Sequence, residues 1–209
     1  TRDRQTAGGT ADAVFLRHHN TENDAARAHD GERPRARRHH ARRTDDGKHQ
    51  ATSFAEIKLM RKAAGINDYV LSEIIHKCQV GMTEVEVAAE AEYLGRKMGA
   101  DIGSATVIMS GPNTNYPAWR PSQRKIEEGD FVMIDFNPSY EHYCNDSGFT
   151  ILMPGSTDAK KKSVVSCHNI IKEIVPLIKP GTSSLTVYEY MLERLEPLGY
   201  SDNFTPYVS

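Results

Sequence analysis

Apolar residues recur at helical spacing in four segments of the chain from Ser53 onward. Two of these segments begin with a capping box, in which a Ser or Thr is followed three residues later by Glu: Ser53–Glu56 and Thr83–Glu86. The last two segments are separated by Pro180-Gly181, a dipeptide that ends helices. The pattern predicts four helices, with approximate bounds 53–78, 83–98, 157–178 and 184–195.

Between the second and third predicted helices the pattern changes to short apolar runs. Residues 105–109 form one run, and residues 131–136 form a second that is rich in strand formers. Asn137-Pro138-Ser139 is turn chemistry, after which apolar residues return as far as Met153. We predict a strand, then a β-hairpin over 131–153, and an α+β fold with helices on one face of a mainly antiparallel sheet.

Two aspartates in the predicted hairpin are the first candidates for chemistry. A reversal around Tyr140 and Glu141 would place Asp135 directly opposite Asp146, with both carboxylates on one face. Opposed like charges destabilise a sheet unless a cation lies between them, and hard divalent cations prefer oxygen ligands. Taken alone, the two residues favour a simpler interpretation, in which Asp135 ends a strand and Asp146 caps a turn.

Other titratable residues have plainer interpretations. We expect the pairs Glu84–Glu86 and Glu127–Glu128 to be solvated cap or turn charges. His142 falls in the predicted turn, at the far end of the hairpin from both aspartates, which does not favour a ligand role. His76 and His168 lie within helical patterns and are expected to be partly exposed.

Residues 1–52 differ in composition from the rest. The first fifty residues contain ten arginines, one lysine and six of the nine histidines, with Val14, Phe15 and Leu16 as their only large apolar side chains. Such a segment cannot bury enough apolar surface to offset chain entropy, so we predict disorder. An alternative hypothesis is that the segment is not native coding sequence, because its composition matches a wrong-frame translation of GC-rich DNA. The interspersed aspartates and lack of Tyr and Trp do not favour a nucleic-acid-binding arm.

Composition also bears on the compartment. The sequence shows no apolar stretch of the length that a signal peptide or a membrane span needs, so no membrane partner is expected. Its three cysteines are widely spaced and form no Cys-x-x-Cys pair. We therefore predict free thiols and a cytoplasmic protein. Residues 53–209 are expected to form the folded part of the chain.

Several segments together resemble the pita-bread metallohydrolases, the family of methionine aminopeptidase, prolidase, Xaa-Pro aminopeptidase and creatinase. The likeness runs from about Ser53 to the C-terminus. It rests on Asp135 within Ile-Asp-Phe, on Asp146 eleven positions later, and on three shorter segments. These shorter segments are Gly81–Glu84, Ser110–Asn113 and Arg124–Asp130.

The resemblance implies that Asp135 and Asp146 are the first two ligands of a dinuclear centre of Mn, Co, Zn or Fe, with Asp146 bridging the ions. It implies a peptidase that cleaves an N-terminal residue or a Xaa-Pro bond in small peptides, and a homodimer in the complete protein. The family fold has two similar halves, and its histidine and glutamate ligands lie in the second. We expect a fragment covering the first half and the helical start of the second. Such a fragment would bind metal weakly or not at all and be inactive.

Two positions depart from the family pattern. Ala118 stands where many members have a histidine, and Phe149 where an arginine is common. These departures give mild support to a creatinase-like hydrolase of a small non-peptide C–N bond that uses no metal, whereas the retention of both aspartates argues against it. A separate alternative is a non-catalytic module that binds peptides or proteins. Trp119, the only tryptophan, is a candidate for lining a substrate pocket, although a packing role is as good an interpretation.

Overall fold

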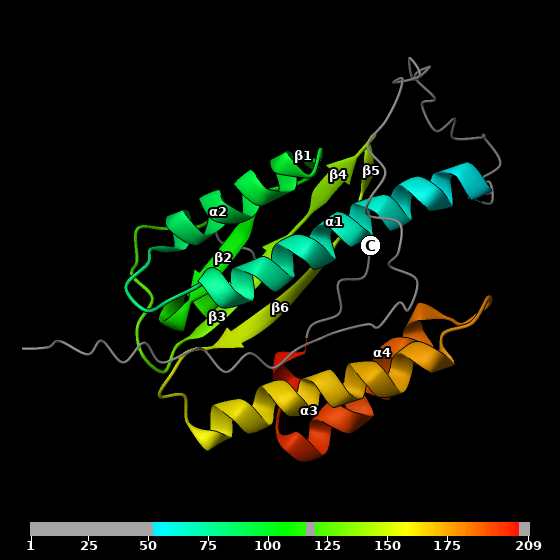
Figure 1. Ribbon diagram of the computed structural model, residues 1–209. Helices are drawn as coiled ribbons and strands as arrows, with labels where there is room; N and C mark the ends of the chain where they lie inside the picture. The colour runs from blue at the N-terminus through cyan, green and yellow to red at the C-terminus, as the bar shows by residue number, and fades with distance from the viewer. Residues whose placement is uncertain (1–51, 116–119, 205–209) are drawn as a thin grey trace, which may run out of the picture.

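The computed structural model describes residues 52–115 and 120–204 (Figure 1). The predicted disordered segment therefore lies, except for Thr52, outside the described residues and stays a prediction. In chain order the main elements are α1 (Phe54–Lys77), α2 (Glu84–Lys97), β1 (Asp101–Ile102), β2 (Val107–Ser110), β3 (Phe131–Phe136), β4 (Pro138–Tyr140), β5 (Tyr143–Cys144), β6 (Ser147–Leu152), α3 (Asp158–Ile174) and α4 (Ser184–Leu195). Short 3-10 helices span Gly111–Asn115, Val175–Leu177, Glu196–Leu198 and Ser201–Asn203.

The four predicted helices are confirmed, and both capping boxes are formed at the starts of α1 and α2. The third helix is shorter than predicted, because α3 ends at Ile174 and continues only as a 3-10 turn. Pro176 explains the difference, since proline has no N–H for the helical ladder and clashes with the preceding turn. Within the described ranges, no helix combines the length and apolar character that crossing a membrane requires.

The strands form two small sheets along one hairpin, and every described strand pair is antiparallel. β3 is the central strand of the first sheet, between β2 and β6, while β4 lies between β1 and β5 in the second. In Figure 1 the two sheets follow each other along the twisted hairpin, and α1 and α2 run along them on one side. This confirms the α+β architecture, and of the four predicted helices α1 and α2 cover one face of the antiparallel sheet.

The hydrophobic core lies between this sheet and the helices α1 and α2. Side chains from both layers are buried there, among them Ile66 and Val70 of α1 and Ile134 of β3. Gly95 allows the layers to approach closely, because a Cβ at this position would lie 2.7 Å from Cζ of Phe136. Burial of these apolar side chains is the main term that holds the helices on the sheet.

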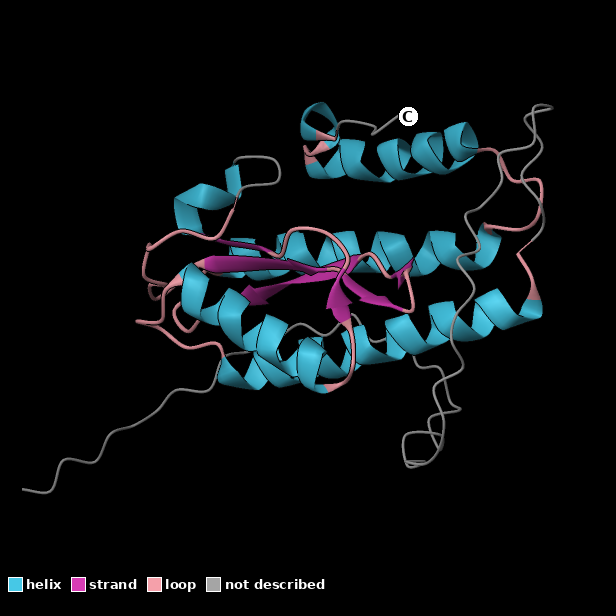
Figure 2. Cartoon of the chain, turned by 90° about the horizontal axis from the view of Figure 1, so that it is seen from above, coloured by secondary structure: helices cyan, strands magenta, loops and turns pink. Residues whose placement is uncertain are grey.

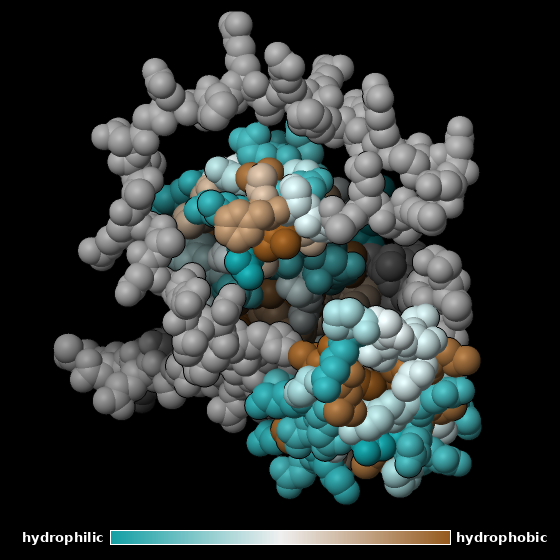
Figure 3. Space-filling view, turned by 90° about the vertical axis from the view of Figure 1, so that its right-hand side faces the viewer, coloured by the Kyte–Doolittle hydropathy of each residue, from teal (hydrophilic) through white to brown (hydrophobic). Residues whose placement is uncertain are grey.

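α3 and α4 are held differently. α3 contacts β6 at the sheet edge, where the Lys160 ammonium donates to the Gly129 carbonyl at 2.6 Å, and α4 packs on α3. Figure 2 shows α4 on the side of the molecule away from α1 and α2. In Figure 3 apolar residues gather on the surface of this helix pair. Exposed large apolar side chains at the turn between the two helices are Val175, Leu177, Ile178 and Leu185.

The register of the hairpin differs from the sequence prediction. The chain reverses at Glu141 and His142, one position later than expected, and Tyr140 pairs with Tyr143. Both turn residues have positive φ, 48° and 70°, as a two-residue type I′ turn requires. Asp135 therefore pairs with Gly148 and not with Asp146. The partner moves by two residues, and a shift of two keeps each side chain on its predicted face.

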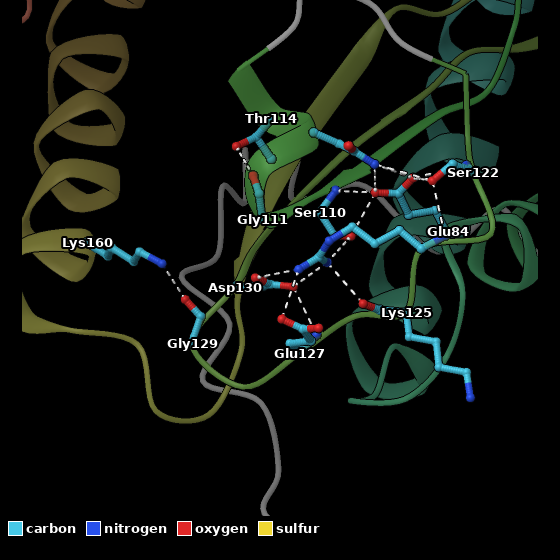
Figure 4. A network of polar contacts seen from close by, with 12 residues as sticks. Glu84, Ser110, Gly111, Thr114, Ser122, Lys125, Glu127, Gly129, Asp130 and Lys160 are labelled. Carbon is cyan, nitrogen blue, oxygen red and sulfur yellow. Dashed lines mark hydrogen bonds and ion pairs between the residues drawn. The ribbon is translucent and has the colours of Figure 1, made fainter.

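Glu84 was expected to be solvated, and this prediction is wrong: the side chain is fully buried at the start of α2. Its carboxylate accepts from the backbone N–H of Ser110 at 2.6 Å and of Ser122 at 2.9 Å, and from both serine hydroxyls at 2.7 Å (Figure 4). The Asn113 amide donates to it as well. Six donor contacts compensate for the lost hydration of the charge. Glu86, in contrast, is exposed as predicted.

Arg124 extends this network to the beginning of β3. Its guanidinium donates to the Ser110 hydroxyl at 2.8 Å and to Asp130, an ion pair with N–O distances of 2.6 and 3.3 Å. Asp130 also accepts from the Glu127 N–H. The three short segments of the sequence resemblance, 81–84, 110–113 and 124–130, thus meet in one polar network that ties α2, β2 and β3 together (Figure 4).

A first prediction concerns the hairpin turn. Left-handed backbone costs a non-glycine residue about 1 kcal/mol, and Asn-Gly is the preferred type I′ pair. The double variant Glu141→Asn/His142→Gly should therefore raise the free energy of unfolding by about 1 kcal/mol. Urea denaturation measures the change. The control Glu141→Ala/His142→Ala keeps the unfavourable φ and should give no gain; equal stabilisation by both variants would contradict the strain argument.

A second prediction concerns Glu84. Glu84→Gln preserves the size of the side chain but turns one acceptor into a donor facing N–H and O–H groups, so we expect a loss of about 2–4 kcal/mol. Glu86→Gln is the matched control two residues along the same helix turn, and glutamine is also suited to a capping box, so its loss should stay under about 0.5 kcal/mol. Equal losses in chemical denaturation would show that the buried network adds nothing.

The stability difference between the unmodified chain and Glu84→Gln should also depend on pH. Desolvation raises the pKa of Glu84, but hydrogen bonds from Ser122, Ser110 and Asn113 outweigh it, and the net pKa is lowered. The unfolded chain therefore binds a proton near pH 4.3 while the native carboxylate is still charged. The stability from Glu84 is present above about pH 4.3 and is lost as pH falls through its lowered native pKa. The difference in melting temperature between the unmodified chain and Glu84→Gln should shrink on acidification across that window.

Candidate metal centre

Asp135 lies on the face of the sheet that α1 and α2 leave open. Along β3 the side chains alternate, and Val132, Ile134 and Phe136 are fully buried toward the helices. Asp135 belongs to the other, half-buried set. It is the last residue but one of the strand, so its carboxylate projects from the open face near the strand end. The predicted placement of Asp135 at the end of a strand is confirmed.

Asp146 falls in a short gap between the two sheets. The register is the same on both sides of this gap, with Phe136 opposite Ser147 and Ser139 opposite Cys144. The continuous register aligns Asp146 with Asn137 and places it diagonally from Asp135 on the same face. Diagonal neighbours across an antiparallel pair lie about 7–8 Å apart, which leaves room for a cation between two carboxylates.

The electrostatics of Asp135 indicate a site that favours a positive charge. Burial raises the pKa of its carboxyl; a hydrogen bond from the Asn137 side chain lowers this pKa, and the nearby Asp146 charge raises it again. Oδ1 of Asp135 is buried, and no hydrogen bond to it is formed by the residues that the structure describes. A buried acceptor without a donor, beside a second carboxylate, has the chemistry of a ligand for a hard cation.

The other sequence candidates lie elsewhere. His142 is exposed at the tip of the hairpin turn, which agrees with the interpretation that it is no ligand, and His76 is exposed on α1. Phe149 is 7% exposed and belongs to the core, so its side chain faces the helices and not the aspartates. Ala118 and Trp119 lie outside the described residues.

The described residues offer at most a pair of ligating side chains at this position. Across residues 52–115 and 120–204, no three His, Cys, Asp or Glu side chains are grouped closely enough to hold a metal ion. Asp135 and Asp146 therefore fit a cation in chemistry and in placement, as a pair and not as a closed cage.

Sequence reasoning missed Asn67, a buried polar residue on α1 that reaches this hairpin. Asn67 is 0% exposed, and its side-chain amide donates to Oγ of Ser147 at 2.7 Å. The available signal was a polar residue at an inward position, between Ile66 and Val70 of the apolar stripe. Glu84 was missed as well, because its place directly after the capping Thr83 is where exposed acidic residues are common.

Comparisons with known proteins bear on the family of the chain. The family model described as Metallopeptidase family M24 matches residues 58–209. The chain is 33% identical over 154 residues to the Xaa-Pro dipeptidase of Pyrococcus furiosus, and the match covers 71% of this chain and 43% of that protein.

Solved structures give the same result. The prolidase from Pyrococcus furiosus superimposes with a TM-score of 0.71 at 30% identity, covering 74% of this chain and 46% of that one. The X-Pro aminopeptidase from Thermotoga maritima gives 0.68 at 27% identity, covering 72% and 42%. The chain thus spans less than half the length of these relatives. It belongs to metallopeptidase family M24 and has part of the pita-bread fold, as the family resemblance of its sequence implied.

Proposed function

We propose that this chain supplies two carboxylate ligands, Asp135 and Asp146, to a dinuclear divalent-metal centre of a peptidase that cleaves Xaa-Pro bonds in small peptides. The observation that carries the proposal is the buried Oδ1 of Asp135 on the open face of the sheet, which accepts no hydrogen bond from the described residues and lies close enough to Asp146 for the second charge to raise the pKa of Asp135. The Xaa-Pro dipeptidase and prolidase relatives support the substrate class.

The residues of this chain would bind the metal ions and orient the carboxylates that hold them. Asp135 and Asp146 hold charge on the open face, and Asn137, 7% exposed, donates to Asp135 and fixes its carboxylate. Metal ions bound there would lower the pKa of a shared water toward neutrality and polarise the scissile carbonyl. Mn, Co, Zn and Fe all suit such a centre, and we propose Mn²⁺ as the probe because carboxylate oxygens favour it.

The setting of the protein is part of the proposal. Cys78, Cys144 and Cys167 are all free thiols, and two of them are exposed, which supports a reducing compartment such as the cytoplasm. The homodimer expected for a protein of the relatives' full length stays a prediction. A metal-free creatinase-like hydrolase and a non-catalytic binding module are the alternatives against which the experiments below discriminate.

A third prediction concerns the 209-residue chain by itself. Metal affinity rises with the number and rigidity of ligands, and two carboxylates leave an ion mainly hydrated. We expect weak Mn²⁺ binding and no turnover of a Xaa-Pro dipeptide. A protein that carries this chain and extends to the length of the relatives should cleave the same dipeptide when Mn²⁺ or Co²⁺ is added. Metal-independent cleavage of a small non-peptide amide would favour the creatinase-like alternative, and no turnover with any metal would favour the binding module.

A fourth prediction separates ligands from turn caps. Without metal, Asp135→Asn and Asp146→Asn each remove a charge from a like-charged pair, so each should stabilise the chain, by on the order of 0.5 kcal/mol. With millimolar Mn²⁺ the sign should invert, because ligand binding to the native state stabilises the unmodified chain more than the variants. Melting curves with and without Mn²⁺ measure both effects.

Asp146→Asn should abolish more of the Mn²⁺-dependent rise in melting temperature than Asp135→Asn if Asp146 bridges both ions. The exposed Asp158→Asn, at the start of α3, is a control for nonspecific cation effects and should keep the full rise. If both hairpin variants shift by the same amount with and without Mn²⁺, the aspartates cap turns and the proposed metal centre is wrong.

A further inference from the structure

Asn67 is the polar residue that α1 buries, among five buried apolar ones: Ala63, Ile66, Val70, Ile74 and Ile75. Its Nδ2 donates to Oγ of Ser147 at 2.7 Å and lies 3.4 Å from the Ser147 carbonyl oxygen. Its own Oδ1 is buried without a hydrogen-bond partner among the described residues. An unpaired buried amide oxygen costs stability, so packing alone gives no reason for an asparagine at this position.

The contact is made at the gap between the two sheets of the hairpin. Asp146 lies in the gap between β5 and β6, outside both strands. The residues on either side of it are joined by their side chains, because Nδ2 of Asn145 donates to the same Ser147 Oγ at 2.9 Å. Asn145 is also bound through its backbone N–H to the Pro138 carbonyl at 3.0 Å. The two chain neighbours of Asp146, Asn145 and Ser147, are therefore joined to each other, and Ser147 is also bound to Asn67.

We propose that Asn67 is a positioning residue for Asp146, acting from behind the sheet through Ser147. The inference rests on the proposed metal centre. Adjacent side chains of an extended chain point to opposite faces. Ser147, bound by Asn67 and opposite the buried Phe136, faces the helices, so Asp146 lies on the same face as Asp135. Holding Ser147 fixes the rotation of the chain at the start of β6, and with it the direction of the Asp146 carboxylate.

Further contacts of α1 fix the helix relative to the hairpin and so support the contact between Asn67 and Ser147. The Tyr143 hydroxyl donates to Glu56 at 3.0 Å, and the Lys62 ammonium lies 5.9 Å from the centre of the Tyr140 ring, so α1 also contacts the tip of the hairpin. Further along the helix, Val70 and Ile74 are fully buried in the core. Groups that orient a ligand change metal affinity about tenfold or more when they are removed. Because Asn67 acts through a neighbour of the ligand, we expect a smaller factor.

The test is a Mn²⁺ titration of the 209-residue chain, followed by paramagnetic broadening of its backbone amide NMR signals, which detects weak binding without any catalytic assay. Asn67→Leu and Ser147→Ala should each raise the apparent Kd for Mn²⁺ about three- to tenfold. The double variant should bind no more weakly than either single variant, because both act on one contact. Ser147→Thr keeps the hydroxyl and should bind like the unmodified chain.

The variants should change the melting temperature and the Mn²⁺ affinity independently of each other. Asn67→Leu removes an unpaired amide from an apolar layer, and its melting temperature should stay level or rise while Mn²⁺ affinity falls. Val70→Ala, three residues along the same buried stripe, is the opposite control: its melting temperature should fall and its Kd should not change. If Asn67→Leu lowers the melting temperature too far for titration, the two Ser147 variants carry the same comparison.

The outcomes distinguish this inference from the function on which it rests. If Asp146→Asn weakens Mn²⁺ binding but Asn67→Leu and Ser147→Ala bind like the unmodified chain, Asn67 has only a structural role and the metal centre stands. If Mn²⁺ does not broaden signals near Gly148 in the unmodified chain, or if Asp146→Asn leaves the titration unchanged, both proposals are wrong.

Discussion

The two aspartates share a face because β3 and β6 pair in one register. Side chains alternate along a strand, so a slip of one residue would turn Asp135 into the apolar layer and Ile134 out to the open face. The 0% exposure of Ile134 shows how strongly the core opposes that slip. Gly148, opposite Asp135, adds a steric condition, because any side chain there would collide with the Ile134 carbonyl oxygen. Core packing and one glycine thus determine where both carboxylates lie.

Buried polar groups define the two ends of this arrangement. At the beginning of β3 the Glu84 carboxylate and the Arg124–Asp130 ion pair join α2, β2 and the turn before the strand. At its end Asn67 joins α1 to the start of β6. Apolar packing is nearly non-directional, whereas each of these groups has to meet particular donors or acceptors. The polar contacts therefore select the relative position of helix and strand that the hydrophobic core leaves less well defined.

The sequence predicted the elements better than the contacts between them. Helix bounds followed from capping boxes and apolar spacing, which act within one segment, and α4 begins and ends where it was predicted. The hairpin partner of Asp135 was wrong because Glu141 and His142 carry no Asn-Gly signal for a type I′ turn. The prediction that Asp135 and Asp146 share a face agrees with the observed register, because a shift of two residues keeps each side chain on its face. Glu84 and Asn67 were missed because their partners lie 26 or more residues away in the chain, beyond the reach of any local pattern.

Stability is not distributed evenly around the candidate centre. α1 and α2 bury a continuous stripe against the sheet, whereas α3 buries Ile170 and Ile174 and α4 buries only Leu195. Local opening has the lowest cost where few apolar contacts are lost, so the α3–α4 pair should open before the sheet does. The end of the hairpin near Asp135 and Asp146 is attached to α1 through Asn67, Tyr140 and Tyr143, whereas α3 contacts the hairpin at β6. Motion of the late helices can therefore leave the geometry of the two carboxylates intact, because the contacts that orient them lie in the firmly packed layer.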